Sequence, residues 1–375
     1  MAERQFQIRP MTITDYDAVL ALRPDLAEAW NNRGAVLADM GRPVEALTSL
    51  DRALALEPDL VAALSNRGFT LRELARFDEA LETLNRALAL APDTVSALAH
   101  RGKVLSEMNR LEESFADFRR VAELGGAPAA EKPAHQLAHD KERQAWLAGQ
   151  SAQAMQGARL TNGAVQARDT AAISRAWRDG TPRIVVIDDL LTPQALAALQ
   201  LYCRAADVWR TAYSQGYLGA FPESGFAAPL LAQVAQELSG AFPEIFAGHP
   251  LRYHWAFKYD SKLEGIGIHA DEAAVNVNFW ITPDGANLDS ESGGLVIWDK
   301  EAPLDWDFAK FNADESAAYD FLAKSGAGSL RIPYRANRAV IFDSNLFHKT
   351  DKIVFAEGYE NQRINVTMLY GRRKG

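Results

Sequence analysis

Two histidines and one aspartate have a spacing that could bind a metal ion. His269 and Asp271 are two residues apart, and His348 follows far downstream. Because side chains alternate across a β-strand, residues two apart point the same way and can hold one ion together. Two imidazoles and one carboxylate that leave other coordination positions open form a ligand set that favours non-haem Fe(II). The sequence therefore predicts an iron site formed by His269, Asp271 and His348.

The segments around these three residues are predicted to be β-strands. The segment 266–269 is short and apolar, and the run 275–281 is rich in β-branched and aromatic residues that favour strands. The apolar run 339–348 ends at His348. Since His348 is far from His269 in sequence, we expect its strand to fold back opposite the first two ligands.

The last predicted strand has a polar face that could bind an acidic co-substrate. In 362–370, Arg363, Asn365 and Thr367 alternate with apolar residues and therefore share one face. A guanidinium pairs a carboxylate through two hydrogen bonds, so Arg363 is the predicted anchor of a dicarboxylate. The alternative is a structural arginine that pairs with Asp343 or Glu360.

Two asparagines are further candidates for the lining of this pocket. Asn365 lies on the same predicted strand as Arg363, and Asn278 lies in the run 275–281, as does Asn276. The alternative is that these amides satisfy backbone groups at the strand ends.

Six residues within 183–375 form a pattern that is similar to one known family. They are Tyr259, Gly267, His269, Asp271, His348 and Arg363. The pattern resembles the Fe(II)/2-oxoglutarate-dependent dioxygenases, in particular the prolyl-hydroxylase branch. This resemblance implies a double-stranded β-helix, or jelly roll, with buttressing helices. It also implies the use of Fe(II), 2-oxoglutarate and O2.

The resemblance further implies a role for each residue. The two histidines and Asp271 would hold iron, and Arg363 would bind the far carboxylate of 2-oxoglutarate with help from Tyr259. The alternative for Tyr259 is a half-buried aromatic residue of a strand. The expected reaction is hydroxylation of a C–H bond, coupled to conversion of 2-oxoglutarate into succinate and carbon dioxide.

The chain departs from the family pattern in the long gap between Asp271 and His348. An insert near 299–328, rich in Asp, Trp and Phe, fills this gap. Loops on a rigid scaffold commonly carry specificity, so we expect the insert to help select the substrate. Helices are predicted at 133–153, 164–179, 192–207 and 229–242. His135 and His139 are four residues apart on the first of these helices and could bind a metal, but no third ligand is apparent, so we expect them on a solvated helix face.

The N-terminal part of the chain repeats with a period of 34 residues. Gly34, Gly68 and Gly102 occupy equivalent positions, and Pro58 and Pro92 follow the ends of the first two repeats. This period is that of the tetratricopeptide repeat. The sequence predicts a cap at 1–26, three repeats at 27–126, a helical linker at 127–182 and the dioxygenase domain at 183–375.

Such repeats stack into a helical solenoid with a concave binding face. The expected partner is a protein or peptide, held by residues such as Asn31, Ser65, Phe69 and Lys103. A recruited polypeptide would then be the hydroxylated substrate. Two alternatives stay open: a small-molecule hydroxylase whose repeats serve assembly, and a repeat scaffold with a non-catalytic barrel.

Composition narrows the classes of function further. A net charge of −9 argues against nucleic acid as the main partner. The single cysteine, Cys203, suits a reducing compartment. The first residues do not look like a signal peptide, and no apolar run is long enough to span a membrane. A cytoplasmic protein without a membrane segment is expected.

Overall fold

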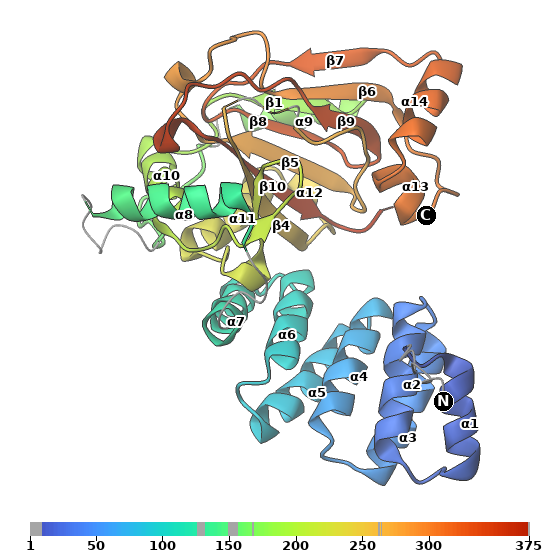
Figure 1. Cartoon of the computed structure of the whole chain (residues 1–375). Coiled ribbons are helices and arrows are strands. Elements are labelled where there is room, and N and C mark those ends of the chain that lie inside the picture. The colour runs from blue at the N-terminus through green and yellow to red at the C-terminus, as the bar shows by residue number, and fades with distance from the viewer. Residues whose placement is uncertain are drawn as a thin grey trace, which may run out of the picture. The chain divides into compact units, whose positions relative to one another are not determined.

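The computed structural model describes residues 10–125, 132–148, 157–166, 169–261, 263 and 265–373. The chain divides into two compact units, Met1–Met108 and Asn109–Gly375 (Figure 1). The first unit is built from helices, and the second contains two antiparallel sheets together with helices. The expected change from helical repeats to a β-rich C-terminal region is confirmed at this level.

The first unit consists of helices that pack as consecutive pairs. A short helix, α1, precedes them, and its N-cap Thr12 forms a capping box with Asp15. The helices are α1 (Ile13–Leu22), α2 (Ala27–Asp39), α3 (Pro43–Leu56), α4 (Val61–Glu73), α5 (Phe77–Leu90) and α6 (Val95–Glu107). Helices α3 and α5 end shortly before Pro58 and Pro92, as the repeat pattern predicts.

The repeated glycines allow the two helices of a repeat to approach closely. A Cβ atom on Gly34 would lie 2.6 Å from Cγ of Leu50, and one on Gly68 would overlap Leu84. Both leucines are fully buried. A larger residue at either glycine would therefore push the paired helices apart.

Equivalent arginines link successive helices of the first unit. Nε of Arg33 donates to Asp17 at 2.7 Å, and Nε of Arg67 donates to Asp51 at the same distance. In the third repeat, Arg101 donates to Asn85 at 3.0 Å. This repetition explains why arginine recurs with the period of the repeat.

The boundary between the two units falls inside the third predicted repeat. Its first helix, α6, belongs to the first unit, and its second helix, α7 (Leu111–Leu124), belongs to the second. The ring of Phe115 on α7 stacks on that of His254 at 4.6 Å, and Arg119 donates to the carbonyl of Ala227. These contacts tie α7 to the β-rich unit.

The larger sheet of the second unit has seven antiparallel strands (Figure 1). Their order across the sheet is β1 (Ile184–Ile187), β8 (Ala339–Asp343), β5 (Val275–Trp280), β10 (Arg363–Tyr370), β4 (Leu251–Tyr259), β3 (Leu218–Ala220) and β2 (Thr211–Ala212). Strands β5 and β10 lie side by side in the middle, with Asn278 opposite Thr367.

The smaller sheet is also antiparallel and includes the strand of His348. Its order is β7 (Ser329–Ile332), β6 (Leu295–Glu301) and β9 (Leu346–Thr350). The segment that leads to His269 runs along β9, because the amide of Thr350 donates to Ile266 and His269 bridges His348. The expected approach of the third ligand to the first two is therefore observed.

Strand β10 has one apolar and one polar face, as its alternation predicts. Ile364, Val366 and Met368 join a core formed with helices α10 (Pro193–Ala205) and α11 (Pro229–Ala241). A second core lies between the two sheets and includes Tyr259 and Trp280. Both faces of β10 are buried, so the polar side chains of Arg363, Asn365 and Thr367 need partners inside the protein.

The insert near 299–328 folds onto the strands of the metal ligands. It contains α13 (Phe308–Asn312) and α14 (Glu315–Lys324). Phe311 and Leu322 from these helices pack with Ile268 and Phe347, which directly precede His269 and His348. The insert therefore forms part of the wall around the candidate site.

One prediction for the linker is wrong in part. The helix expected at 164–179 is shorter, α9 (Thr170–Asp179), because the backbone at Ala164 and Gln166 pairs with the segment before α10. Helix α8 (Ala134–Leu147) confirms the start of the helix expected at 133–153, and residues 149–153 lie outside the described residues.

Helix α8 also differs from expectation in its exposure to solvent. We expected His135 and His139 on a solvated helix face. His139 is instead buried, with Nε2 3.2 Å from Nζ of Lys258 on β4. Burial lowers the pKa of Lys258 well below its usual value.

Among the helices that the structure describes, none combines the length and apolarity needed to cross a bilayer.

Candidate metal centre

The side chains of His269, Asp271 and His348 lie close together between the two sheets. One potential ligand atom from each lies within 4.8 Å of the other two. Nε2 of His348 is 3.4 Å from Asp271, and Nε2 of His269 is 3.9 Å from it. Within the part of the chain that the structure describes, no other three residues of these types bring ligand atoms so close together.

The backbone fixes both imidazoles in the tautomer that a metal requires. Nδ1 of His269 is 2.8 Å from the carbonyl of Gly267, and Nδ1 of His348 is 3.0 Å from that of Leu346. A carbonyl only accepts hydrogen bonds, so each Nδ1 carries the proton and each Nε2 presents a lone pair. This second contact is the usual way in which proteins orient a ligating histidine.

The charge states of His269 and Asp271 also suit a divalent cation. Burial lowers the pKa of His269 to about 4, and His348 adds to this effect. Burial alone would raise the pKa of Asp271, but His348, His269 and Asn276 outweigh it and lower that pKa below its usual value. At neutral pH the site therefore combines an ionised carboxylate with a neutral His269.

Arg363 lies at the other end of the polar face and is almost completely buried. Its Nε donates to the carbonyl of Gly293 at 2.7 Å, and Nη1 donates to Asn365 at 3.1 Å. The two acidic residues considered as structural partners of Arg363 have other hydrogen bonds. Glu360 accepts from Trp146, and Asp343 accepts from the amide of Asn345.

Aromatic rings surround the guanidinium of Arg363. Its central carbon is 5.1 Å from the ring centre of Tyr259, 5.9 Å from that of Trp280 and 6.0 Å from that of Tyr334. The nearby carboxylate of Asp351 pairs with Arg331. Burial lowers the pKa of Arg363. We call Arg363 and the three rings around it, Tyr259, Trp280 and Tyr334, the arginine pocket. This pocket holds the positive charge of Arg363 away from solvent.

Two buried donors beside Arg363 have no hydrogen bond of normal geometry among the described residues. They are the hydroxyl of Tyr259 and Nε1 of Trp280. Burial raises the pKa of Tyr259 to about 12, against the opposing effect of Arg363, so its hydroxyl keeps its proton. A cation and two free donors suit a carboxylate. The sequence analysis did not predict Trp280 as a site residue. Trp280 follows Asn276 and Asn278 at intervals of two residues and therefore lies on the same face of β5.

Asn278 and Asn365 lie between the metal ligands and the arginine pocket. They occupy the neighbouring strands β5 and β10, are both buried, and hydrogen bond to each other at 3.2 Å. The structure thus brings all seven predicted site residues together on the inner surface of the β-rich unit. It places Asn276 and Trp280 beside them.

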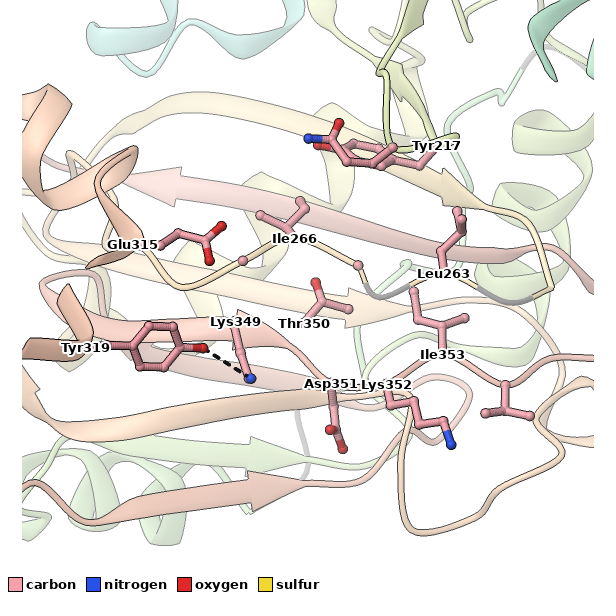
Figure 2. Close-up of a pocket in the computed structure, with 14 residues that line it drawn as sticks. Tyr217, Leu263, Ile266, Glu315, Tyr319, Lys349, Thr350, Asp351, Lys352 and Ile353 are labelled. Atoms are coloured by element: carbon pink, nitrogen blue, oxygen red, sulfur yellow. Dashed lines mark hydrogen bonds between the residues drawn. The ribbon is translucent and has the colours of Figure 1, made fainter. Parts of the chain in front are cut away.

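An open groove of about 1190 Å³ runs next to this site (Figure 2). Gly267 and Thr350 line it, and each is two residues from a histidine ligand. Helix α14 contributes Glu315 and Tyr319, and Figure 2 shows the Glu315 carboxylate directed toward the segment of Ile266. A Cβ atom on Gly267 would overlap this carboxylate, so glycine is needed for its approach.

Comparison with known proteins supports the repeats of the first unit. Residues 25–93 match the tetratricopeptide repeat family. No curated protein sequence matches the chain. The chain therefore contains tetratricopeptide repeats, a motif that generally mediates contacts between proteins.

Several solved repeat structures are similar over part of the chain. A MamA protein is 23% identical, with 30% of this chain and 62% of that chain covered and a TM-score of 0.28. MamA 41-end from Desulfovibrio magneticus RS-1 is 26% identical, with 30% and 64% covered and a TM-score of 0.28. The first TPR domain of human RPAP3 is 27% identical, with 27% and 80% covered and a TM-score of 0.26. The match spans less than two thirds of these two MamA chains.

Proposed function

We propose that the second unit is an Fe(II)- and 2-oxoglutarate-dependent dioxygenase that hydroxylates a C–H bond of a polypeptide. The observation that carries this proposal is the pairing of two buried sites. One consists of His269, Asp271 and His348, and the other is the arginine pocket with its two free donors.

The strand order supports a double-stranded β-helix for this unit. From β4 to β10 the chain passes between the two sheets: β4, β5, β8 and β10 lie in the larger sheet, and the segment before His269, β6, β7 and β9 lie in the smaller one. Seven strands and one bridged segment in two facing antiparallel sheets favour a jelly roll. Helices α10 and α11 cover the outer face of the larger sheet.

The residues present fit the proposed metal and co-substrate. Two imidazole nitrogens and one carboxylate with open positions favour Fe(II) among divalent metals. Arg363, Tyr259 and Trp280 would hold the far carboxylate of 2-oxoglutarate. When bound, Fe(II), 2-oxoglutarate and O2 together supply the oxidation of a C–H bond. The chain orients these groups and keeps water from them, as burial of Asp271 and His348 indicates.

The groove favours a polypeptide over a small metabolite as the substrate. Small-molecule sites are enclosed and commonly about 300–1,000 Å³ in volume. The groove beside His269 is larger and open, and charged side chains such as Glu315 and Lys349 line it. Tetratricopeptide repeats in the same chain offer a second surface through which a polypeptide could be recruited.

Anaerobic titration of the purified protein tests the proposed function. Addition of Fe(II) and then 2-oxoglutarate should produce the weak visible charge-transfer band of the chelate. His269→Ala should remove the band without change in the far-UV circular dichroism spectrum. A folded wild-type protein that shows no band would refute the co-substrate assignment.

A further inference from the structure

A continuous line of hydrogen bonds connects Arg363 to the metal ligand Asp271. Arg363 donates to Oδ1 of Asn365 at 3.1 Å, and Asn365 donates to Oδ1 of Asn278 at 3.2 Å. Asn278 donates to Oδ1 of Asn276 at 2.9 Å, and Asn276 donates to Oδ2 of Asp271 at 2.7 Å. We call Asn365, Asn278 and Asn276 the amide relay.

The two ends of the relay determine the direction of every amide within it. Arg363 can only donate, and the carboxylate of a metal-bound Asp271 can only accept. Each asparagine must therefore turn its oxygen toward Arg363 and its NH2 group toward Asp271. If one amide rotated by half a turn, its oxygen would face another acceptor on one side. Its NH2 group would face another donor on the other side. The chemistry of the ends thus supports the assigned amide orientations.

A side branch strengthens the assignment at the middle of the relay. The hydroxyl of Thr367 is 3.2 Å from Oδ1 of Asn278, to which it donates, and it accepts from Asn365 at 3.3 Å. Thr367 lies directly opposite Asn278 in the strand pairing. Asn278 therefore receives two hydrogen bonds on its oxygen, which leaves its NH2 group for Asn276.

Burial makes the relay costly to interrupt. Asn276, Asn278 and Asn365 are 0%, 5% and 6% exposed, so solvent cannot easily replace a lost partner. Loss of one amide removes one hydrogen bond from each of its two neighbours and so loosens their orientation. At the end of the relay, Asn276 would then no longer hold Oδ2 of Asp271 in one orientation.

We propose that Asn276, Asn278 and Asn365 are positioning residues that orient the Asp271 carboxylate toward the metal. Through them, the arginine that is proposed to bind the co-substrate also sets the geometry of a metal ligand. The inference rests on the part of the proposed function that places a divalent metal on Asp271. It extends that function by coupling the two sites through residues that need touch neither metal nor co-substrate.

Binding of Co(II) to the full chain tests the relay without catalytic turnover. Its visible absorption reports both affinity and the arrangement of ligands. Asn276→Leu should weaken Co(II) binding by roughly 10–100-fold, the usual effect of removing a residue that orients a ligand. Asn278→Leu should also weaken binding and alter the band shape, although Asn278 does not contact Asp271.

Thr367→Val is the matched control, because it removes the side branch and leaves the relay intact. It should bind Co(II) as the wild type does. Wild-type affinity and spectrum in folded Asn278→Leu would overturn the relay, even if Asn276→Leu alone had an effect. A wild-type protein that binds no Co(II) would instead refute the metal site itself, so the two failures can be told apart.

Asn278→Asp provides a second variant in case the leucine variants do not fold. Its carboxylate cannot donate to Asn276, so Asn276 must turn and present its oxygen to Asp271. The relay therefore predicts weaker Co(II) binding by several-fold or more. A purely electrostatic role predicts the reverse, because the variant adds a negative charge near the metal. Tighter binding by Asn278→Asp would overturn the proposal.

Discussion

Replacement of Arg363 by methionine should abolish the preference of the site for a second carboxylate on the 2-oxo acid. Methionine keeps much of the apolar stem and removes the charge and donors. Two of the five N–H groups of Arg363 donate to Gly293 and Asn365, so others are left for a ligand. Removal of one partner of a buried charge pair costs about 2–5 kcal/mol.

This free energy corresponds to a loss of affinity for 2-oxoglutarate of roughly 30-fold to several thousand-fold. We expect the upper part of this range, because Arg363 is only 1% exposed and solvent screens it little. The assay is anaerobic titration of the Fe(II)-loaded protein, with the charge-transfer band as the readout.

Pyruvate provides the internal control, because it has the same 2-oxo acid group and no second carboxylate. Pyruvate should lose much less affinity than 2-oxoglutarate in Arg363→Met, because it loses only the effect that Arg363 has on the metal site through the amide relay. The variant should therefore bind 2-oxoglutarate about as weakly as pyruvate. Equal losses for both ligands would mean that Arg363 acts only on the structure of the site, and undiminished binding of 2-oxoglutarate would refute its role.

Three further predictions concern stability. Gly68→Ala should destabilise the first unit by about 1–3 kcal/mol, because a Cβ atom there overlaps buried Leu84; thermal unfolding of the full chain measures this. Phe115→Ala should lower the free energy of unfolding by about 3–5 kcal/mol and lower the unfolding temperature of the second unit. A shift confined to the first unit would contradict the placement of α7 in the second. The hydrogen bond from Arg338 lowers the pKa of Asp188, so Asp188→Asn should cost about 1 kcal/mol near neutral pH in urea unfolding. This deficit should vanish as pH falls below the lowered pKa, and a deficit that persists at acidic pH would show that charge is not its cause.

The sequence predicted the three candidate metal ligands more completely than their surroundings. A spacing of two residues on a strand is enough to place His269 and Asp271 on one side, and the apolar run before His348 indicates its strand. Nothing in the sequence indicates that Nδ1 of each histidine faces the carbonyl two residues before it. These contacts depend on the local backbone path, which periodicity does not specify.

The amide relay required knowledge of strand register. The asparagines on β5 were visible as candidates for lining, and Asn365 was placed on the same face as Arg363. Their connection depends on the pairing of Asn278 with Thr367 across β5 and β10, which one sequence does not contain. Trp280 was missed for a different reason: it was considered only as part of the β-rich run 275–281, although it lies on the same face of that strand as Asn278.

Long-range packing explains the other differences. The repeat pattern continues through α7, so the sequence favours a third complete repeat. The unit boundary is instead set by contacts of Phe115 and Arg119 with residues far along the chain. His139 looked exposed for the same reason, since the strand residue that covers it, Lys258, cannot be recognised from the helix alone.

The polar groups of the inner surface independently indicate what the site binds: a cation at one end and an anion at the other. Around Asp271 the groups left for a ligand are Oδ1 of the carboxylate and Nε2 of each histidine. Around Arg363 the free groups are donors: the hydroxyl of Tyr259 and Nε1 of Trp280. Between these ends the amides satisfy one another. Buried groups need partners, so the first end requires a cation and the second an anion. A metal chelated by one end of a dicarboxylic 2-oxo acid, with its other carboxylate at Arg363, meets both requirements at once, whereas a monocarboxylic acid leaves the donors at the second end unsatisfied.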